Sequence, residues 1–312
     1  MTVWIGGRKK PWAVRAGQDW PSRKGGFRRH VTRISVALVI CLLLAVGCVE
    51  GPSQRPNGGL AVTVSILPQR YFVQRIGGDR VDVQVMVMPG ESPATYEPTP
   101  AQLRALSASD AYFHIGVPFE NAWLPRIAAA NSAMLMVDTA EGIDRVGEGL
   151  NSDPHIWLSP SLVKIQARTI YEALEALDPA HGTQYAANLD AFQVQIERLD
   201  ADIKETLAGI DQRKFMVFHP SWGYFARDYG LEMIPVEVGG QEPSAAELAA
   251  LIDQARREGI HVVFAQPEFS TKAAETVANE IGGEVLLISP LAEDWMSNMR
   301  SVAKAFAKVL GR

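Results

Sequence analysis

The strongest constraint on the fold is a strand–helix alternation that occurs twice, on either side of one long helical segment. In the first half, short apolar segments lie at residues 62–66, 81–87, 111–115 and 134–137, and in the second half at residues 214–218, 231–238, 261–265 and 284–288. Helical patterns separate the members of each set. Strands that alternate with helices form mostly parallel sheets with helices on both faces. We therefore expect an α/β fold of two lobes.

The segment between the two sets reads as a single long helix. Residues 185–208 contain neither glycine nor proline, and their apolar side chains recur at spacings of three and four. That pattern gives one apolar face along a helix of roughly 40 Å. We predict an N-terminal lobe over residues 60–178, a linking helix over 179–209 and a C-terminal lobe over 210–312.

The first 59 residues have the composition of an export leader and a tether. Residues 34–47 are uncharged and apolar, follow a basic stretch, and are too short for a comfortable membrane span. Because small residues precede Cys48, we expect a signal peptide over 1–47, lipidation of Cys48 and a tether over 48–59. An uncleaved membrane anchor is the alternative. Residues 1–30 resemble neither a signal nor a domain, and one hypothesis is that translation begins near Val31.

Charge and cysteine usage exclude two classes of protein. The chain carries a net charge of −5, and residues 1–33 hold nine basic residues and one acidic residue, so residues 34–312 carry −13. An acidic body opposes binding to nucleic acid. The two cysteines, Cys41 and Cys48, both lie in or at the end of the leader. No disulfide framework is therefore available to the folded part.

Two of the six histidines are placed for binding chemistry. Open α/β sheets bind ligands beyond the carboxyl ends of their strands. His155 and His219 follow predicted strands, one in each lobe, and each is next to a proline that stiffens its loop. We treat His30, His114, His181 and His261 as structural or surface residues. Because neutral imidazole is the commonest protein ligand for divalent metals, a metal shared by His155 and His219 is the simplest interpretation, with a packed core histidine as the alternative for either residue.

Several longer motifs together resemble a known family. They are YEPTP at residues 96–100, DPHIWLSP at 153–160, FHPSWGYFARDYG at 218–230, QPEFSTKAAETVANEIGG at 266–283 and the terminal PLAEDW at 290–295. In this order they are similar to the zinc- and manganese-type solute-binding lipoproteins of ABC transporters. The resemblance implies a two-lobed receptor with a rigid linking helix, which holds one divalent ion between its lobes and delivers it to a membrane permease. We expect this exported receptor to be a monomer.

The family's metal ligands are only partly present. The resemblance places its second and third ligands on His155 and His219, but its first, a histidine, falls on Ala94, and its last, usually an aspartate, falls on Ser289. Since zinc usually takes three or four protein ligands, we expect a replacement carboxylate. Glu268, in a loop after a predicted strand, is the first candidate, with a solvated carboxylate as the alternative interpretation.

Other residues near these loops are given weaker roles. Glu91 is a less favoured ligand, and Tyr96 is expected to pack, because ligation by a phenolate needs a large pKa shift. Glu242 and Asp294 are interpreted as structural or surface acids. Trp157, Trp222 and Trp295 are expected to wall the site or the core.

Two other functions compete with a receptor for a bare metal ion. The same fold could bind a metal chelate or another small solute, since Ala94 and Ser289 open space. A metal-dependent hydrolase would use an open coordination position to activate water. Against the hydrolase, the chain has no H-E-x-x-H pair and no evident general base beside either histidine. These residues give no support to a surface adhesin.

Overall fold

The computed structural model describes residues 59–311, apart from 148, 150–151, 238–240 and 269–270. The described residues belong to one compact unit. The predicted leader, Cys48 and all but the last residue of the predicted tether lie outside them. Within the described part of the chain, no helix has both the length and the apolar character that crossing a membrane requires.

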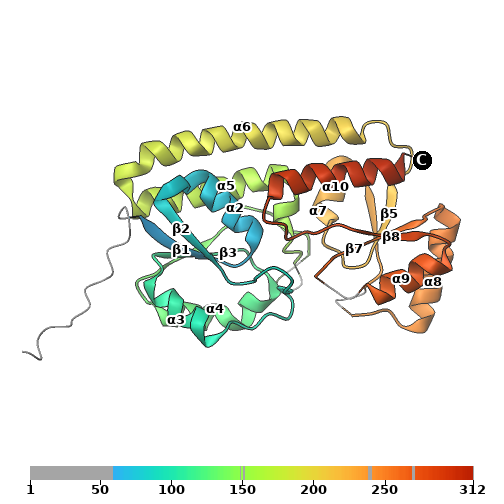
Figure 1. Cartoon of the computed structure of the whole chain (residues 1–312), viewed down its shortest axis with the longest axis horizontal. Helices are drawn as coiled ribbons and strands as arrows, with labels where there is room; N and C mark the ends of the chain where they lie inside the picture. The colour runs from blue at the N-terminus through green and yellow to red at the C-terminus, as the bar shows by residue number, and fades with distance from the viewer. Residues whose placement is uncertain (1–58, 148, 150–151, 238–240, 269–270, 312) are drawn as a thin grey trace, which may run out of the picture. The chain divides into compact units, whose positions relative to one another are not determined.

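The N-terminal lobe is a four-stranded parallel sheet with helices on its faces (Figure 1). Its strands are β1 (Leu60–Val64), β2 (Val81–Val85), β3 (Ala111–His114) and β4 (Leu135–Asp138), and its helices are α2 (Leu67–Gly77), α3 (Pro100–Ala105) and α4 (Pro118–Ala130), with short 3₁₀ turns η2 (Gly78–Arg80) and η3 (Leu106–Ala108). The strand order is β2-β1-β3-β4. Register is fixed by pairs such as Val62 with Val83 and with Ala111.

The C-terminal lobe repeats this topology. Its strands are β5 (Lys214–Val217), β6 (Glu232–Pro235), β7 (Val262–Ala265) and β8 (Glu284–Leu287), and its helices are α7 (Gly223–Tyr229), α8 (Ala245–Glu258), α9 (Lys272–Glu280) and α10 (Trp295–Leu310). The order β6-β5-β7-β8 is again fully parallel. The two sheets confirm the predicted fold class.

This strand order creates a switch point in each sheet. The chain leaves β1 toward one side of the sheet and β3 toward the other, and it does the same at β5 and β7. The connections diverge there, and a crevice opens beyond the carboxyl ends of the central strands. The loops after β1, β3, β5 and β7 are therefore the places where a ligand site is expected.

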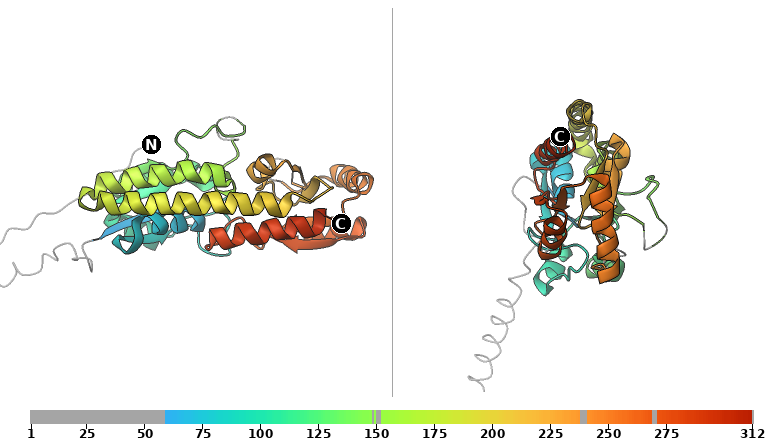
Figure 2. Two further views of the ribbon diagram at one scale, coloured as in Figure 1. Left: turned by 90° about the horizontal axis from the view of Figure 1, so that it is seen from above. Right: turned by 90° about the vertical axis from the view of Figure 1, so that its right-hand side faces the viewer.

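A helical layer connects the two lobes. The segment η5 (Ile156–Leu158) leads into α5 (Pro160–Leu177), η6 (Pro179–His181) and the 26-residue α6 (Gly182–Leu207). Helix α6 packs on α2 and α5 at one end and on α10 toward the other (Figures 1 and 2). Its predicted apolar face is buried, comprising Leu189, Phe192, Ile196, Leu199, Ile203 and Leu207.

Helix boundaries follow the local chemistry of the sequence. Thr99 caps α3 by accepting from the backbone N–H of Gln102, whose side chain reaches back to Thr99. Ser244 and Glu247 form the same capping box at α8. The C-cap of α8 is Gly259 at φ 66°, a left-handed conformation that glycine adopts without strain.

Most of the hydrophobic core is continuous from one lobe to the other. Alternate residues of β5, Phe215 and Val217, face this core, and Phe215 packs 4.6 Å from Phe306 of α10, measured between ring centroids. Met216, between them, faces a second, smaller core under α8 and α9. This period of two is what a strand buried on both faces requires.

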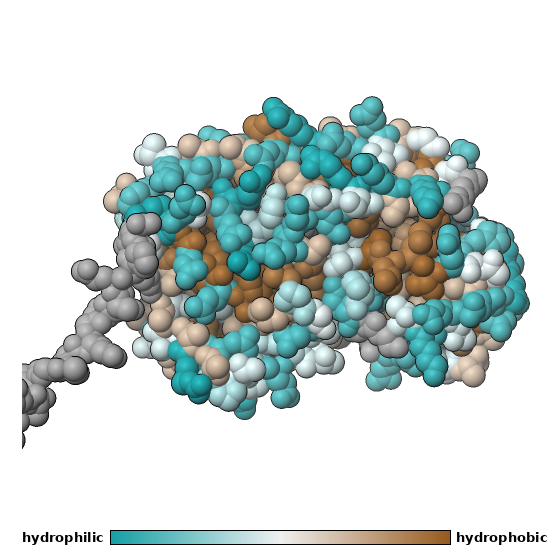
Figure 3. Space-filling view, in the orientation of Figure 1, coloured by the Kyte–Doolittle hydropathy of each residue, from teal (hydrophilic) through white to brown (hydrophobic). Residues whose placement is uncertain are grey.

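The edge strands are the least covered parts of the sheets. Leu287 at the end of β8 is 58% exposed, and Leu135 at the start of β4 is 38% exposed. Figure 3 shows apolar patches over both lobes on one face of the molecule, set among polar side chains. The edge strands β4 and β8 therefore each leave a large apolar side chain in contact with solvent.

Candidate metal site

His155 is held in place by the residues that precede it. It follows Pro154 and forms the N-cap of η5. Asp153 Oδ1 accepts two hydrogen bonds from it, one from its backbone N–H at 2.9 Å and one from its ring Nδ1 at 2.7 Å. A side chain at Gly223 would crowd this carboxylate, because a Cβ there would lie 3.1 Å from Asp153 Oδ2. Burial lowers the pKa of His155 and outweighs the opposing effect of Asp153. The neutral ring, the form that binds metals, is therefore favoured.

His219 has an equivalent support in the other lobe. It follows β5, and its ring Nδ1 lies 2.5 Å from Glu237 Oε2. Glu237 follows β6, the neighbour of β5, and its backbone N–H donates to Phe218 O. In both histidines a carboxylate contacts Nδ1 and holds the ring in place. Metal-binding histidines in proteins almost always have such a partner.

The two imidazoles meet where the lobes face each other. Their ring centroids are 5.4 Å apart at an interplanar angle of 74°. Both rings line a cavity of about 550 Å³. The other lining residues come from the strand-end loops of both lobes and from nearby elements: Ser92, Pro93, Ala94, Val117, Pro118, Ser152, Asp153, Pro154, Trp157, Pro220, Met233, Gln266, Pro290 and Leu291. The sequence analysis predicted this convergence of His155 and His219.

Three hydrogen bonds, two of them buried, tie the two lobes together beside the cavity. Trp157 Nε1 donates to Pro290 O at 2.7 Å, and Trp295 Nε1 donates to Trp157 O at the same distance. Tyr224 OH donates to Asp153 O at 3.1 Å. Trp157 lines the cavity, whereas Trp222 and Trp295 are in the core. These contacts fix the distance between the loops that carry the two histidines.

In the loop over residues 91–100, Ala94 presents a methyl group to the cavity. The family that this chain resembles has a histidine at that position. Ala94 is exposed and lines the cavity. Pro93 O accepts from the backbone N–H of Phe119, and Tyr96 packs edge-on against Phe119 with ring centroids 5.1 Å apart. Tyr96 is 7% exposed, which confirms that it packs. The loop is thus anchored without an ionisable side chain at position 94.

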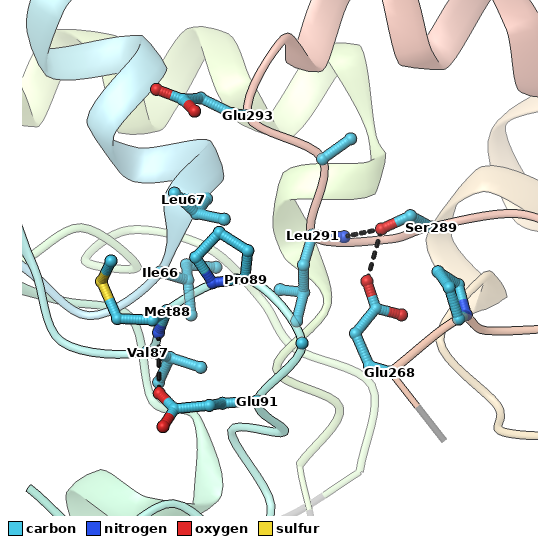
Figure 4. A pocket seen from close by; sticks show the side chains of 13 residues that line it. Ile66, Leu67, Val87, Met88, Pro89, Glu91, Glu268, Ser289, Leu291 and Glu293 are labelled. Carbon is cyan, nitrogen blue, oxygen red and sulfur yellow. Dashed lines mark hydrogen bonds between the residues drawn. The ribbon is translucent and has the colours of Figure 1, made fainter. Parts of the chain in front are cut away.

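Glu268 lies in a neighbouring pocket and not beside the imidazoles. This pocket has a volume of about 350 Å³ and shares Leu291 with the first (Figure 4). Glu268 Oε1 accepts from Ser289 Oγ at 2.6 Å. Its Oε2 is buried and has no hydrogen-bond partner among the described residues. The carboxylate therefore sits against Ser289, the second position where a family ligand is missing. Glu91 lines the same pocket and accepts from the backbone N–H of Met88.

The other histidines have structural surroundings where they are described. His114 Nδ1 lies 3.8 Å from Asp138 Oδ1, and burial lowers the pKa of His114. His181 contacts Asp178, and His261 is exposed. His30 lies outside the described residues. Across the described parts of residues 59–311, no group of three or more His, Cys, Asp or Glu side chains is arranged to hold a metal ion.

Sequence reasoning missed the two carboxylates that support the histidines. Asp153 stands two residues before His155 in the same motif, so its proximity was a signal that could have been used. Glu237 is 18 residues from His219, and only the pairing of β5 with β6 brings them together. No local pattern in the sequence marks Glu237 as a partner of His219.

The fold and the cavity define a class of protein. Two parallel-sheet lobes joined by a long helix, with a cavity between their strand ends, are the architecture of a solute-binding protein. The comparisons then identify the family. Residues 62–309 match the model of the family described as "Zinc-uptake complex component A periplasmic". The chain belongs to this family of transport proteins, and it is not an enzyme.

Individual relatives agree with this assignment. A Chlamydia muridarum protein named as a candidate metal-binding protein is 31% identical over 277 residues, covering 86% of this chain and 99% of that protein. The high-affinity zinc uptake system protein ZnuA of Bacillus subtilis is 26% identical over 278 residues, covering 81% and 86%. A crystal structure of ZnuA superposes with a TM-score of 0.78 and 51% identity, covering 80% of this chain and 99% of that one.

Proposed function

We propose that this protein is the exported receptor of an ABC importer, that it binds a divalent metal ion of the zinc or manganese type between its lobes, and that His155 and His219 are its anchoring ligands. The observation that carries the proposal is the pair of imidazoles, 5.4 Å apart between centroids and each supported at Nδ1 by a carboxylate. Membership of the zinc-uptake family supports the choice of cargo.

Zinc is the first ion that we propose for this site, with manganese as the alternative. Imidazole nitrogen with carboxylate oxygen is a common zinc ligand set, although such sites also accept other first-row ions. Asp153 and Glu237 would also compensate the charge of a bound cation, since both carboxylates face the imidazoles. The ion is cargo to be delivered to a permease, and so the site must also release it.

Glu268 is proposed as a third protein ligand. The unpartnered buried Oε2 of its carboxylate supports this role, because a buried oxygen without a partner carries a desolvation cost that a cation would remove. In the structure as described, Glu268 accepts a hydrogen bond from Ser289 in the neighbouring pocket, which shares Leu291 with the cavity that the imidazoles line. Ligation by Glu268 would therefore require its side chain to leave Ser289 and enter the cavity that the imidazoles line.

The proposal includes a lipid anchor and a membrane partner. Cys48 is the proposed lipidation site, which would hold the receptor at the cell membrane or in the periplasm next to the permease. We propose a monomeric receptor. A Cys48→Ser variant is expected to move from the membrane fraction to the soluble fraction, and its retention at the membrane would contradict lipid anchoring.

Equilibrium dialysis against zinc, manganese and other divalent ions tests the metal proposal. We expect binding tighter than about 10 μM, which is about −7 kcal/mol. At a metal concentration of 100 times Kd, the protein should gain about 2.7 kcal/mol of stability, a rise in Tm of about 5–10 °C for a domain of this size. His155→Ala and His219→Ala should each abolish that rise, whereas His261→Ala, at an exposed histidine, should keep it.

Two results would separate the parts of this proposal. Retention of the metal-dependent rise in Tm by both His155→Ala and His219→Ala would refute the assigned site. Glu268→Gln should weaken binding, and an unchanged affinity would remove Glu268 from the ligand set while leaving the two histidines in place.

A further inference from the structure

The cavity beside the two imidazoles is much larger than a metal ion needs. Its volume is about 550 Å³. A water molecule in the liquid occupies about 30 Å³, and pockets that enclose small organic ligands have volumes of about 300–1,000 Å³. The space next to His155 and His219 is therefore in the range of an organic ligand.

The protein offers few metal donors around this space. Among the described residues that line it, the only His, Cys, Asp or Glu side chains are Asp153, His155 and His219. Asp153 already supports His155. Ala94, on the opposite loop, presents a methyl group, and the backbone contacts of Pro93 and Ala94 hold that loop in place. This side of the cavity therefore has room but no imidazole or carboxylate.

A zinc ion needs more ligands than these side chains supply. A zinc ion takes four ligands in a tetrahedral arrangement. His155 and His219 supply two, and Glu268 could supply one more only by leaving Ser289. Counting the described residues alone, at least one coordination position, and two with Glu268 in its described place, is left open to a ligand in the cavity.

The cavity lining restricts what that ligand can be. Val117, Trp157, Met233 and Leu291 give it apolar and aromatic walls, and none of the described residues that line it is Lys or Arg. A free anion would find no protein cation there. A chelator whose carboxylate is neutralised by the metal, and whose carbon skeleton contacts the apolar wall, fits both features.

We infer that the cargo is a divalent ion carried with a small chelator of amino-acid size, which binds the metal through a nitrogen or sulfur donor together with a carboxylate. The inference rests on the proposed function, because His155 and His219 hold the ion. The chelator occupies the cavity on the Ala94 side and completes the coordination sphere. The unit that enters the site is then a metal complex.

Native mass spectrometry of the purified protein tests this directly. The samples contain ZnCl₂ alone, L-histidine or L-cysteine alone, and ZnCl₂ with each amino acid at equal concentration. We expect a 1:1:1 complex of protein, zinc and amino acid with at least one of the two, no binding of either amino acid without zinc, and binding of the zinc complex at least tenfold tighter than that of zinc alone by calorimetry.

Placing an imidazole on the cavity wall at position 94 tests where the chelator binds. Ala94→His should bind bare zinc at least tenfold more tightly than the unmodified protein and should lose the ternary complex, because the new side chain fills the chelator's position. Ala129→His, at an exposed alanine of α4 outside the cavity lining, is the matched control and should change neither property.

The outcomes distinguish the inference from the proposed function. Tight binding of zinc alone, with no ternary complex for either amino acid, would overturn the chelator and leave the metal receptor intact. A ternary complex that persists in Ala94→His at unchanged affinity would overturn the assigned chelator position. Failure to bind zinc under every condition would overturn the metal site and the chelator together.

Discussion

Replacing Glu237 with glutamine should weaken metal binding without disturbing the fold. Glu237 Oε2 lies 2.5 Å from His219 Nδ1, and its side chain is only 11% exposed, so solvent screens this contact weakly. Glutamine keeps the shape and an oxygen acceptor but removes the negative charge that makes the imidazole a better donor to a metal. Loss of such a supporting partner typically costs 10–100-fold in metal affinity, or about 1.4–2.8 kcal/mol. Because the contact is short and shielded from solvent, we expect a loss of affinity toward the upper end of this range.

The assay is a titration of zinc against Glu237→Gln and the unmodified protein, by calorimetry or by competition with a metal indicator. Glu284→Gln, an exposed carboxylate at the start of β8, is the matched control and should bind zinc as the unmodified protein does. The Tm of each metal-free variant shows whether the fold is intact. Unchanged zinc affinity in a folded Glu237→Gln variant would refute the argument that carboxylates position these histidines for a metal.

Two further predictions concern stability. Trp157→Phe should lower the free energy of unfolding in denaturant titrations by at least about 1–3 kcal/mol, because it leaves the buried Pro290 O without its donor; an unchanged stability would mean that this inter-lobe hydrogen bond contributes nothing. Burial raises the pKa of Glu120 from 4.5 to about 7. Between these two pH values, the folded state holds a proton that the unfolded state has released. Stability from this group is present below pH 4.5 and is lost as the pH rises toward 7, by about 3 kcal/mol. Glu120→Gln, which cannot ionise, should flatten that part of the pH dependence of unfolding, and an identical pH profile in both proteins would contradict the assignment.

The glutamate at position 120 also shows why burial decides the chemistry of a side chain. Its carboxyl group accepts hydrogen bonds from the backbone N–H groups of Ile115 and Gly116, directly after β3. In the sequence it is an ordinary acidic residue in the first turn of a helix. Only the fold shows that desolvation outweighs those hydrogen bonds and favours the neutral form.

The sequence by itself determined the architecture and singled out the two histidines of the candidate site. Apolar segments with a period suited to buried strands, alternating with helices, predicted two parallel sheets, and the apolar face of residues 185–208 predicted the linking helix. His155 and His219 could be selected because each follows a strand and adjoins a proline. These properties are local, and periodicity and backbone stiffness can be read from neighbouring residues.

The tertiary structure alone decided which other side chains contact those residues and how much space surrounds them. Glu237 reaches His219 through the pairing of two strands, and Glu268 turns to Ser289 in a separate pocket. The size of the cavity beside Ala94 also depends on side chains from both lobes. Contacts and volumes of this kind join residues far apart in the chain, and they are set by packing and register. Local sequence patterns contain no information about either.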